Sequence, residues 1–322
     1  MNSKHSRWNL VSDPRHGFLN YFTDSIIKGL EENPNFLPDI KRGSTIFIGS
    51  DYGGGHSSAT HNSMAFLFAD IERCGHWLGI HKTIRNKYLP DGRRVSYKSL
   101  GDNLKKHFLI PFLHSANLIP GVIFLILIDK RISDLFDNID NIRSIPFFKR
   151  YSHWKSGVLK KAISANIFVS LFLGGLSRAN QDVMWITDED DIVANDDRLL
   201  EFIDIFKNYS GHFLSHNLRH FRLGTTKVDS GNRQIEDLVS IPDLTCGVLT
   251  DLISLWHKIG FQLSENIILP PPPKFKKKSY EFMNWFADER QPLRRIVFRI
   301  NKDKGDHKIL ITRLKFHSTS DY

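Results

Sequence analysis

The sequence predicts an α/β protein built around a mixed β-sheet. Two continuous apolar runs, GVIFLILI (121–128) and DVMWIT (182–187), are typical of strands that are buried on both faces. Segments with helical spacing separate these runs, and strands joined by a crossover helix pair in parallel. Three earlier strand candidates can form an antiparallel meander. The expected fold is therefore a mixed sheet of a three-strand meander plus parallel strands, flanked by helices and followed by a C-terminal helix and a basic hairpin.

Each expected element follows from a local pattern. TIFIGS (45–50) is a β-branched run that ends at Asp51 and a glycine triplet. Asn195 is expected to cap the helix that follows it, and Pro242 to lie in the first turn of a late helix. The expected order is strands at 45–50, 63–71 and 93–100, a helix at 101–116, a strand at 121–128, a helix at 156–176, a strand at 182–187, a helix at 196–209, a short strand at 224–228 and a helix at 241–256.

Composition places the chain among globular proteins. It has 322 residues, of which 41% are hydrophobic and 25% charged, which excludes a mostly disordered or fibrous chain. The two cysteines, Cys74 and Cys246, lie far apart and form no disulfide framework, so a reducing, cytoplasmic setting is expected. No apolar run reaches the roughly 18 residues that span a bilayer, so no membrane partner is expected.

The net charge of +9 belongs mainly to the C-terminal end of the chain. After a tetraproline (270–273), residues 274–322 carry 13 Lys/Arg against six Asp/Glu. This part is expected to form a helix (279–288) and a hairpin (294–300 with 308–314) that alternates apolar and basic residues. The hairpin is either a solvated edge or a contact for the phosphate backbone of a nucleic acid. Three parts are therefore expected: an N-terminal extension (1–43), an α/β domain (44–269), and a Pro-rich linker with a basic appendage (270–322).

Acidic residues follow the predicted strands. Asp51 follows the first strand, Asp188 and Glu189 follow the strand at 182–187, and Asp243 begins the late helix. The carboxyl ends of parallel strands line one crevice, so these acids can converge although they are far apart in sequence. Converging carboxylates are the hard oxygen ligands that Mg²⁺ or Mn²⁺ prefers. Taken alone, an Asp that follows a strand is more often a turn former or a helix cap than a metal ligand.

These motifs resemble the domain-of-unknown-function family 3800, uncharacterised proteins that are similar to ribonuclease H and regarded as probable nucleases. The matching segments are IFIGSDYGGGH, RRVSYKSLGD, VMWITDEDD and SIPDLTCGVL, and the resemblance covers roughly residues 44–258. It implies a ribonuclease H-like domain over 44–269, with Asp51, Asp188, Glu189 and Asp243 as the catalytic residues. The sequence departs from the family pattern at Tyr52, where a second acid is usual, and at Ser240, where Gln is usual. Asp237, in Gln234–Asp237, and Asp129, after the strand at 121–128, remain alternative ligands.

The function that follows is metal-dependent hydrolysis of phosphodiesters in RNA or DNA, of the two-metal type. Asp51, Asp188 and Asp243 are expected to hold Mg²⁺ or Mn²⁺, with Glu189 as a ligand or water-orienting base. Lys98 either neutralises a phosphate or is a solvated lysine. A nucleic acid is the expected partner, and the expected activity is that of a hydrolase, a nuclease that uses magnesium or manganese. The alternatives are a non-catalytic nucleic-acid or protein-binding module on the same scaffold and a small-molecule phosphohydrolase.

Overall fold

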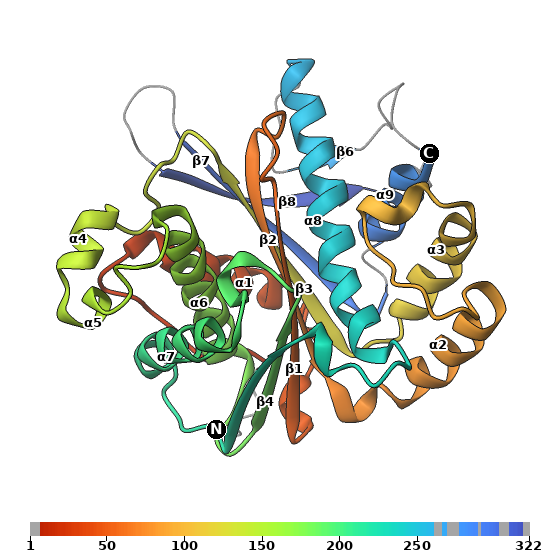
Figure 1. Cartoon of the computed structure of the whole chain (residues 1–322), viewed down its shortest axis with the longest axis horizontal. Coiled ribbons are helices and arrows are strands. Elements are labelled where there is room, and N and C mark those ends of the chain that lie inside the picture. The colour runs from red at the N-terminus through yellow and green to blue at the C-terminus, as the bar shows by residue number, and fades with distance from the viewer. Residues whose placement is uncertain (1–6, 261–265, 269–276, 289–290, 303–308, 318–322) are drawn as a thin grey trace.

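The protein folds around one mixed β-sheet that is flanked by helices on both faces (Figure 1). The computed structural model describes residues 7–260, 266–268, 277–288, 291–302 and 309–317. Within these residues, seven strands form the main sheet and a three-residue strand, β6, pairs with its last strand. The strands are β1 (Thr45–Gly53), β2 (His61–Asp70), β3 (Gly121–Asp129), β4 (Asp182–Thr187), β5 (His220–Thr225), β6 (Asn266–Ile268), β7 (Arg294–Lys302) and β8 (Ile309–His317).

The order of strands across the sheet is β5-β4-β1-β2-β3-β7-β8-β6. Strands β1, β2 and β3 form an antiparallel meander, and β4 and β5 extend it in parallel on the side of β1. Strand β7 pairs in parallel with β3, and β8 returns antiparallel to β7. The predicted α/β class with a mixed sheet flanked by helices is thus confirmed.

The prediction of the third strand was wrong. Residues 93–100 form a loop and the start of a short 3-10 helix, Lys98–Gly101, and the third strand of the meander is β3. Every residue of β3 is buried, whereas a strand at 93–100 would bring Arg93, Arg94 and Lys98 into the sheet interior. Burying unpaired charges there is costly, so the apolar run takes the central position.

Two other elements begin at residues different from those predicted. The short strand expected at 224–228 lies at His220–Thr225, and a 3-10 helix occupies Thr226–Val228. The late helix begins at Gln234 rather than near residue 241, so that Pro242 lies inside it. The early start brings two acidic residues into the first turn, where the helix dipole favours them.

The helices cover the sheet in two layers. Figure 1 shows α1, α6 and α7 on one face and α2, α3, α8 and α9 on the other. The helices are α1 (Asn20–Glu32), α2 (Gly75–Tyr88), α3 (Asn103–Ala116), α4 (Ile139–Ser144), α5 (Pro146–Lys149), α6 (Ser156–Leu176), α7 (Asp196–Phe213), α8 (Gln234–Lys258) and α9 (Lys277–Ala287). By length and composition alone α6 and α8 could each span a membrane, but 78% of each tested window is buried inside the protein, as expected of helices that cover a sheet.

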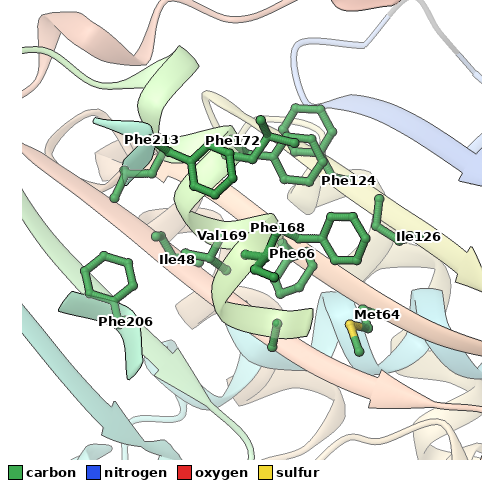
Figure 2. Packing of buried hydrophobic residues seen from close by; sticks show 14 of the residues in the cluster. Ile48, Met64, Phe66, Phe124, Ile126, Phe168, Val169, Phe172, Phe206 and Phe213 are labelled. Atoms are coloured by element: carbon green, nitrogen blue, oxygen red, sulfur yellow. The ribbon is translucent and has the colours of Figure 1, made fainter. Parts of the chain in front are cut away.

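Strand alternation separates two hydrophobic cores. Ile46 and Ile48 of β1 face α6, whereas Phe47 faces α8. Figure 2 shows the first core, where phenylalanines of the sheet meet those of α6. The rings of Phe124 and Phe172 stack there at 4.0 Å between centroids. The sheet is therefore rigidly held between two packed layers, and its strand ends are fixed relative to one another.

Both terminal parts of the described chain belong to these cores. Phe22 of α1 lies 4.6 Å from Phe298 of β7, measured between ring centroids. The predicted hairpin is present, but β7 is an interior strand and its basic side chains do not form an outward face. Arg299 is 9% exposed, and Arg295 lies over the Trp285 ring and donates to the Asp288 carbonyl. The tetraproline (270–273) lies outside the described residues.

Candidate metal-binding carboxylate site

Asp51 and Asp188 lie side by side at the ends of two parallel strands. Strands β1 and β4 pair in register up to Ser50 and Thr187, and Asp188 donates its backbone N–H to the Ser50 carbonyl at 3.4 Å. The next residue on each strand is the aspartate. Alternation places both aspartates on the α8 face, because Phe47 of β1 and Ile186 of β4 pack there. The sheet register alone therefore brings these two carboxylates together.

Asp243 reaches the same place from α8. The helix packs closely on β1 because β1 carries glycine on this face. A Cβ added to Gly49 would lie 3.6 Å from Val239 Cα, and one added to Gly53 would lie 3.0 Å from Cys246 Cβ. The Cys246 thiol, one helical turn after Asp243, donates to the Asp51 carbonyl at 3.3 Å. We refer to Asp51, Asp188 and Asp243 as the carboxylate site.

Burial and mutual repulsion raise the pKa values of this site. Burial raises the pKa of Asp51 well above its usual range, and the charges of Asp243 and Asp188 raise it further. Burial also raises the pKa of Asp243 to about 6; the Tyr97 N–H and Lys98 oppose this shift, and Asp188 adds to it. Among the described residues, no cationic side chain pairs within 4 Å with any of the three carboxylates. Within the part of the chain that the structure describes, the site is thus a cluster of like charges without a direct counterion.

Glu189 lies beside this cluster and points to solvent. It is exposed, and its carboxylate is 3.4 Å from Lys227 Nζ. Asp188 is the better anchored of the two, because its Oδ1 accepts from the Thr226 hydroxyl at 3.2 Å and from the Glu189 N–H at 2.8 Å. Asp190 also contributes to the raised pKa of Asp51, although Lys161 Nζ binds its carboxylate at 2.7 Å. The effect of Asp190 on Asp51 was not predicted from the sequence, where Asp190 is one of four consecutive acids.

The two alternative ligands lie elsewhere. Asp237 is buried in α8 and holds α2 through His81 Nε2 and Arg85 Nε, each 2.6 Å from its Oδ2. Asp129 ends β3, which β2 separates from β1, and Arg131 Nε binds its carboxylate at 2.9 Å. Both carboxylates are neutralised by an arginine. These two aspartates therefore stabilise the fold, and they do not join Asp51 as metal ligands.

Tyr52 does not occupy the space between Asp51 and Asp188. It points to the opposite face of the sheet, where its hydroxyl lies 3.2 Å from Ser50 Oγ and its ring meets Phe66 edge-on. A second acid at position 52, as the resemblance to family 3800 leads us to expect, would point to the α6 face, so Tyr52 leaves the α8 face unchanged. Gly54, which follows in the turn, has φ 86° and takes a conformation that other residues rarely adopt.

The segment 93–102, of which residues 93–100 were predicted as a strand, covers one side of the carboxylate site. The Tyr97 N–H donates to Asp243 Oδ2 at 2.5 Å, and its hydroxyl donates to Asp251, two turns further along α8. Lys98 is exposed, and its charge acts on Asp243. Asp251 is also approached by His56 of the β1–β2 turn, at 3.5 Å. Only the tertiary fold reveals these contacts, since Tyr97 and Asp243 are 146 residues apart.

The donor set of the carboxylate site suits a hard divalent cation. Carboxylate oxygens are the hard ligands that Mg²⁺ and Mn²⁺ prefer. In the described part of the chain, no three His, Cys, Asp or Glu side chains are already spaced to hold one ion. The fit therefore rests on the donor chemistry and on the three elements that supply it.

Comparisons with known proteins add no family to these observations. No protein-family model matches the chain, and no curated protein sequence matches it.

Proposed function

We propose that this protein is a metal-dependent nuclease that hydrolyses phosphodiesters in RNA or DNA on a ribonuclease H-like scaffold. The observation that carries the proposal is the convergence of Asp51, Asp188 and Asp243 from β1, β4 and α8. The strand order β3-β2-β1-β4-β5, an antiparallel meander followed by two parallel strands, supports the scaffold assignment. The resemblance of the surrounding motifs to family 3800 points to the same chemistry.

The chain's own residues have separate roles in this proposal. Asp51, Asp188 and Asp243 hold the cation. Mg²⁺ or Mn²⁺, when bound, supplies activation of a water and stabilisation of the oxygens of the phosphodiester. The Tyr97 N–H and the Thr226 hydroxyl orient Asp243 and Asp188.

Two residues at the rim of the site complete the proposal. Glu189 orients the attacking water after its side chain leaves Lys227, a short rotation for an exposed residue. Lys98 adds a positive charge where the substrate phosphate approaches. Neither residue holds the cation in this account.

A cleavage assay with matched variants tests the proposal. Labelled single- and double-stranded RNA and DNA are incubated with Mg²⁺, Mn²⁺ or EDTA, and we expect cleavage that needs the metal. Asp51→Asn combined with Asp188→Asn should abolish it, whereas Asp204→Asn, which removes one carboxylate on α7, should retain it. Cleavage that survives the double substitution would overturn the assignment.

The second candidate is a non-catalytic nucleic-acid-binding module on the same scaffold. Tyr52 favours it, because the second acid of the family's opening motif is replaced. Salt-dependent binding of nucleic acid without cleavage in either metal, and without calorimetric binding of Mn²⁺, would select this candidate over the nuclease.

A further inference from the structure

We propose that the groove between α3 and α9 binds a single-stranded nucleic acid and leads it to the carboxylate site. The groove encloses about 920 Å³, and its lining includes Tyr88, Lys106, His107, Ile110 and Lys278. We refer to it as the α3–α9 groove. The proposal rests on the proposed nuclease function and specifies its substrate class. The groove also replaces the basic C-terminal hairpin as the expected contact for a nucleic acid, because Arg299 of that hairpin is buried and Arg295 is half-buried against Trp285.

The charge of the α3–α9 groove fits an anionic ligand. Lys106 and Lys278 line it with His107, and among the described residues of the lining Glu281 is the one carboxylate. Lysines that line a groove neutralise phosphates one by one and release counterions, which is the main source of affinity for a nucleic-acid backbone.

The floor of the groove fits bases rather than a closed duplex. Tyr88 is half-buried at the end of α2, and Ile110 is 41% exposed although it is apolar. Pro111 continues this apolar surface, whereas Leu109 is buried. A duplex presents phosphates to such a surface and keeps its bases stacked, whereas a single strand can place bases on the tyrosine ring and the apolar floor. A positive groove with an aromatic platform therefore favours the single strand.

The segment 93–102 lies between the α3–α9 groove and the carboxylate site. Gly101 of this segment lines the groove, and Lys278 Nζ lies 5.2 Å from the centre of the Tyr97 ring. The backbone of Tyr97 in turn binds Asp243. In this proposal, a strand that leaves the groove toward the three carboxylates passes Tyr97.

Fluorescence anisotropy in EDTA tests this inference without cleavage. The probes are labelled single-stranded RNA, single-stranded DNA and a duplex of the same sequence, each titrated with the full-length protein at several KCl concentrations. We expect the single strands to bind more tightly than the duplex. Lys106→Glu with Lys278→Glu should weaken single-strand binding by about tenfold or more and lower the salt slope by roughly 0.7 per lost phosphate contact. Tyr88→Ala should weaken it about fivefold or more.

The control is a pair of charge reversals on the opposite face, Lys28→Glu with Lys155→Glu. Both lysines are exposed, on α1 and before α6, and the net charge changes equally. Thermal melting checks that every variant is folded. Equal binding by the groove pair and the control pair, or tighter binding of the duplex, would overturn the inference. If binding depends on the groove but the protein never cleaves, the proposed nuclease function alone is refuted. If cleavage is unaffected by the groove substitutions, the proposed role of the groove alone is refuted.

Discussion

Asp243→Asn should stabilise the metal-free protein, and the gain should grow with pH. Burial raises the pKa of Asp243 from 3.8 to about 6, so between these values the folded state binds more protons than the unfolded state. The free energy of unfolding therefore falls as pH rises from about 4 through 6. At about 1.4 kcal/mol per pH unit, the free energy of unfolding falls by about 3 kcal/mol over this interval. The full loss is present above pH 6.

The asparagine avoids this cost because it carries no charge. Its amide oxygen still accepts the Tyr97 N–H, and the pKa of about 6 already includes the effect of that bond on the charged carboxylate. The expected gain at pH 8 is then about 3 kcal/mol, or roughly 4 °C in melting temperature for a chain of this length. At pH 4 the gain should shrink toward zero.

The assay is thermal unfolding in EDTA at pH 4 and pH 8, followed by circular dichroism. Asp204→Asn on α7 is the control, because this carboxylate is exposed and should change the melting temperature little at either pH. A melting temperature of Asp243→Asn that is below wild type at pH 8, or a gain that is the same at both pH values, would refute the reasoning. Either result would mean that Asp243 is compensated in the folded protein.

Three further substitutions test the structure around the site. Asp237→Asn, on the same helix as Asp243, should have the opposite sign and cost about 3–5 kcal/mol in urea unfolding, because it breaks a buried ion pair. Gly247→Ala should cost about 1–2 kcal/mol and speed amide hydrogen exchange at Tyr97, since its Cβ would lie 2.2 Å from that ring. Gly54→Ala should lower the free energy of unfolding by about 1–3 kcal/mol, because φ is 86° and the Cβ would lie 2.2 Å from the His61 carbonyl. Gly55→Ala is the control and should be nearly neutral in the same unfolding assay.

Local sequence patterns were enough to predict the strands that are buried along their whole length. The strands at 121–129 and 182–187 were predictable because an unbroken apolar run fits a strand that is covered on both faces. The approach of Asp51 to Asp188 was predictable for a related reason, since residues that follow parallel strands meet at one edge of a sheet. Each inference starts from a short run of residues and from the general layout of a parallel sheet.

The rest required tertiary contacts. Residues 93–100 alternate as a strand would, but β3 outcompetes them for the central position and leaves them to cover Asp243. Asp237 matches the family's helix motif as well as Asp243 does, and only Arg85, 152 residues away, shows that its charge is already used. The basic alternation of the C-terminal hairpin gave no sign that Arg295 would be held by Trp285 and Asn117.

Crystals soaked in Mn²⁺ provide the most direct test of the carboxylate site. Anomalous difference density locates manganese without any assumption about activity. We predict a peak between Asp51 and Asp188 with Asp243 as a further ligand, and no such peak in Asp51→Asn crystals soaked in the same way. Wild-type crystals with the site open to solvent and no peak there, or manganese bound only at other carboxylates such as Asp129, would contradict a metal-dependent function for this protein.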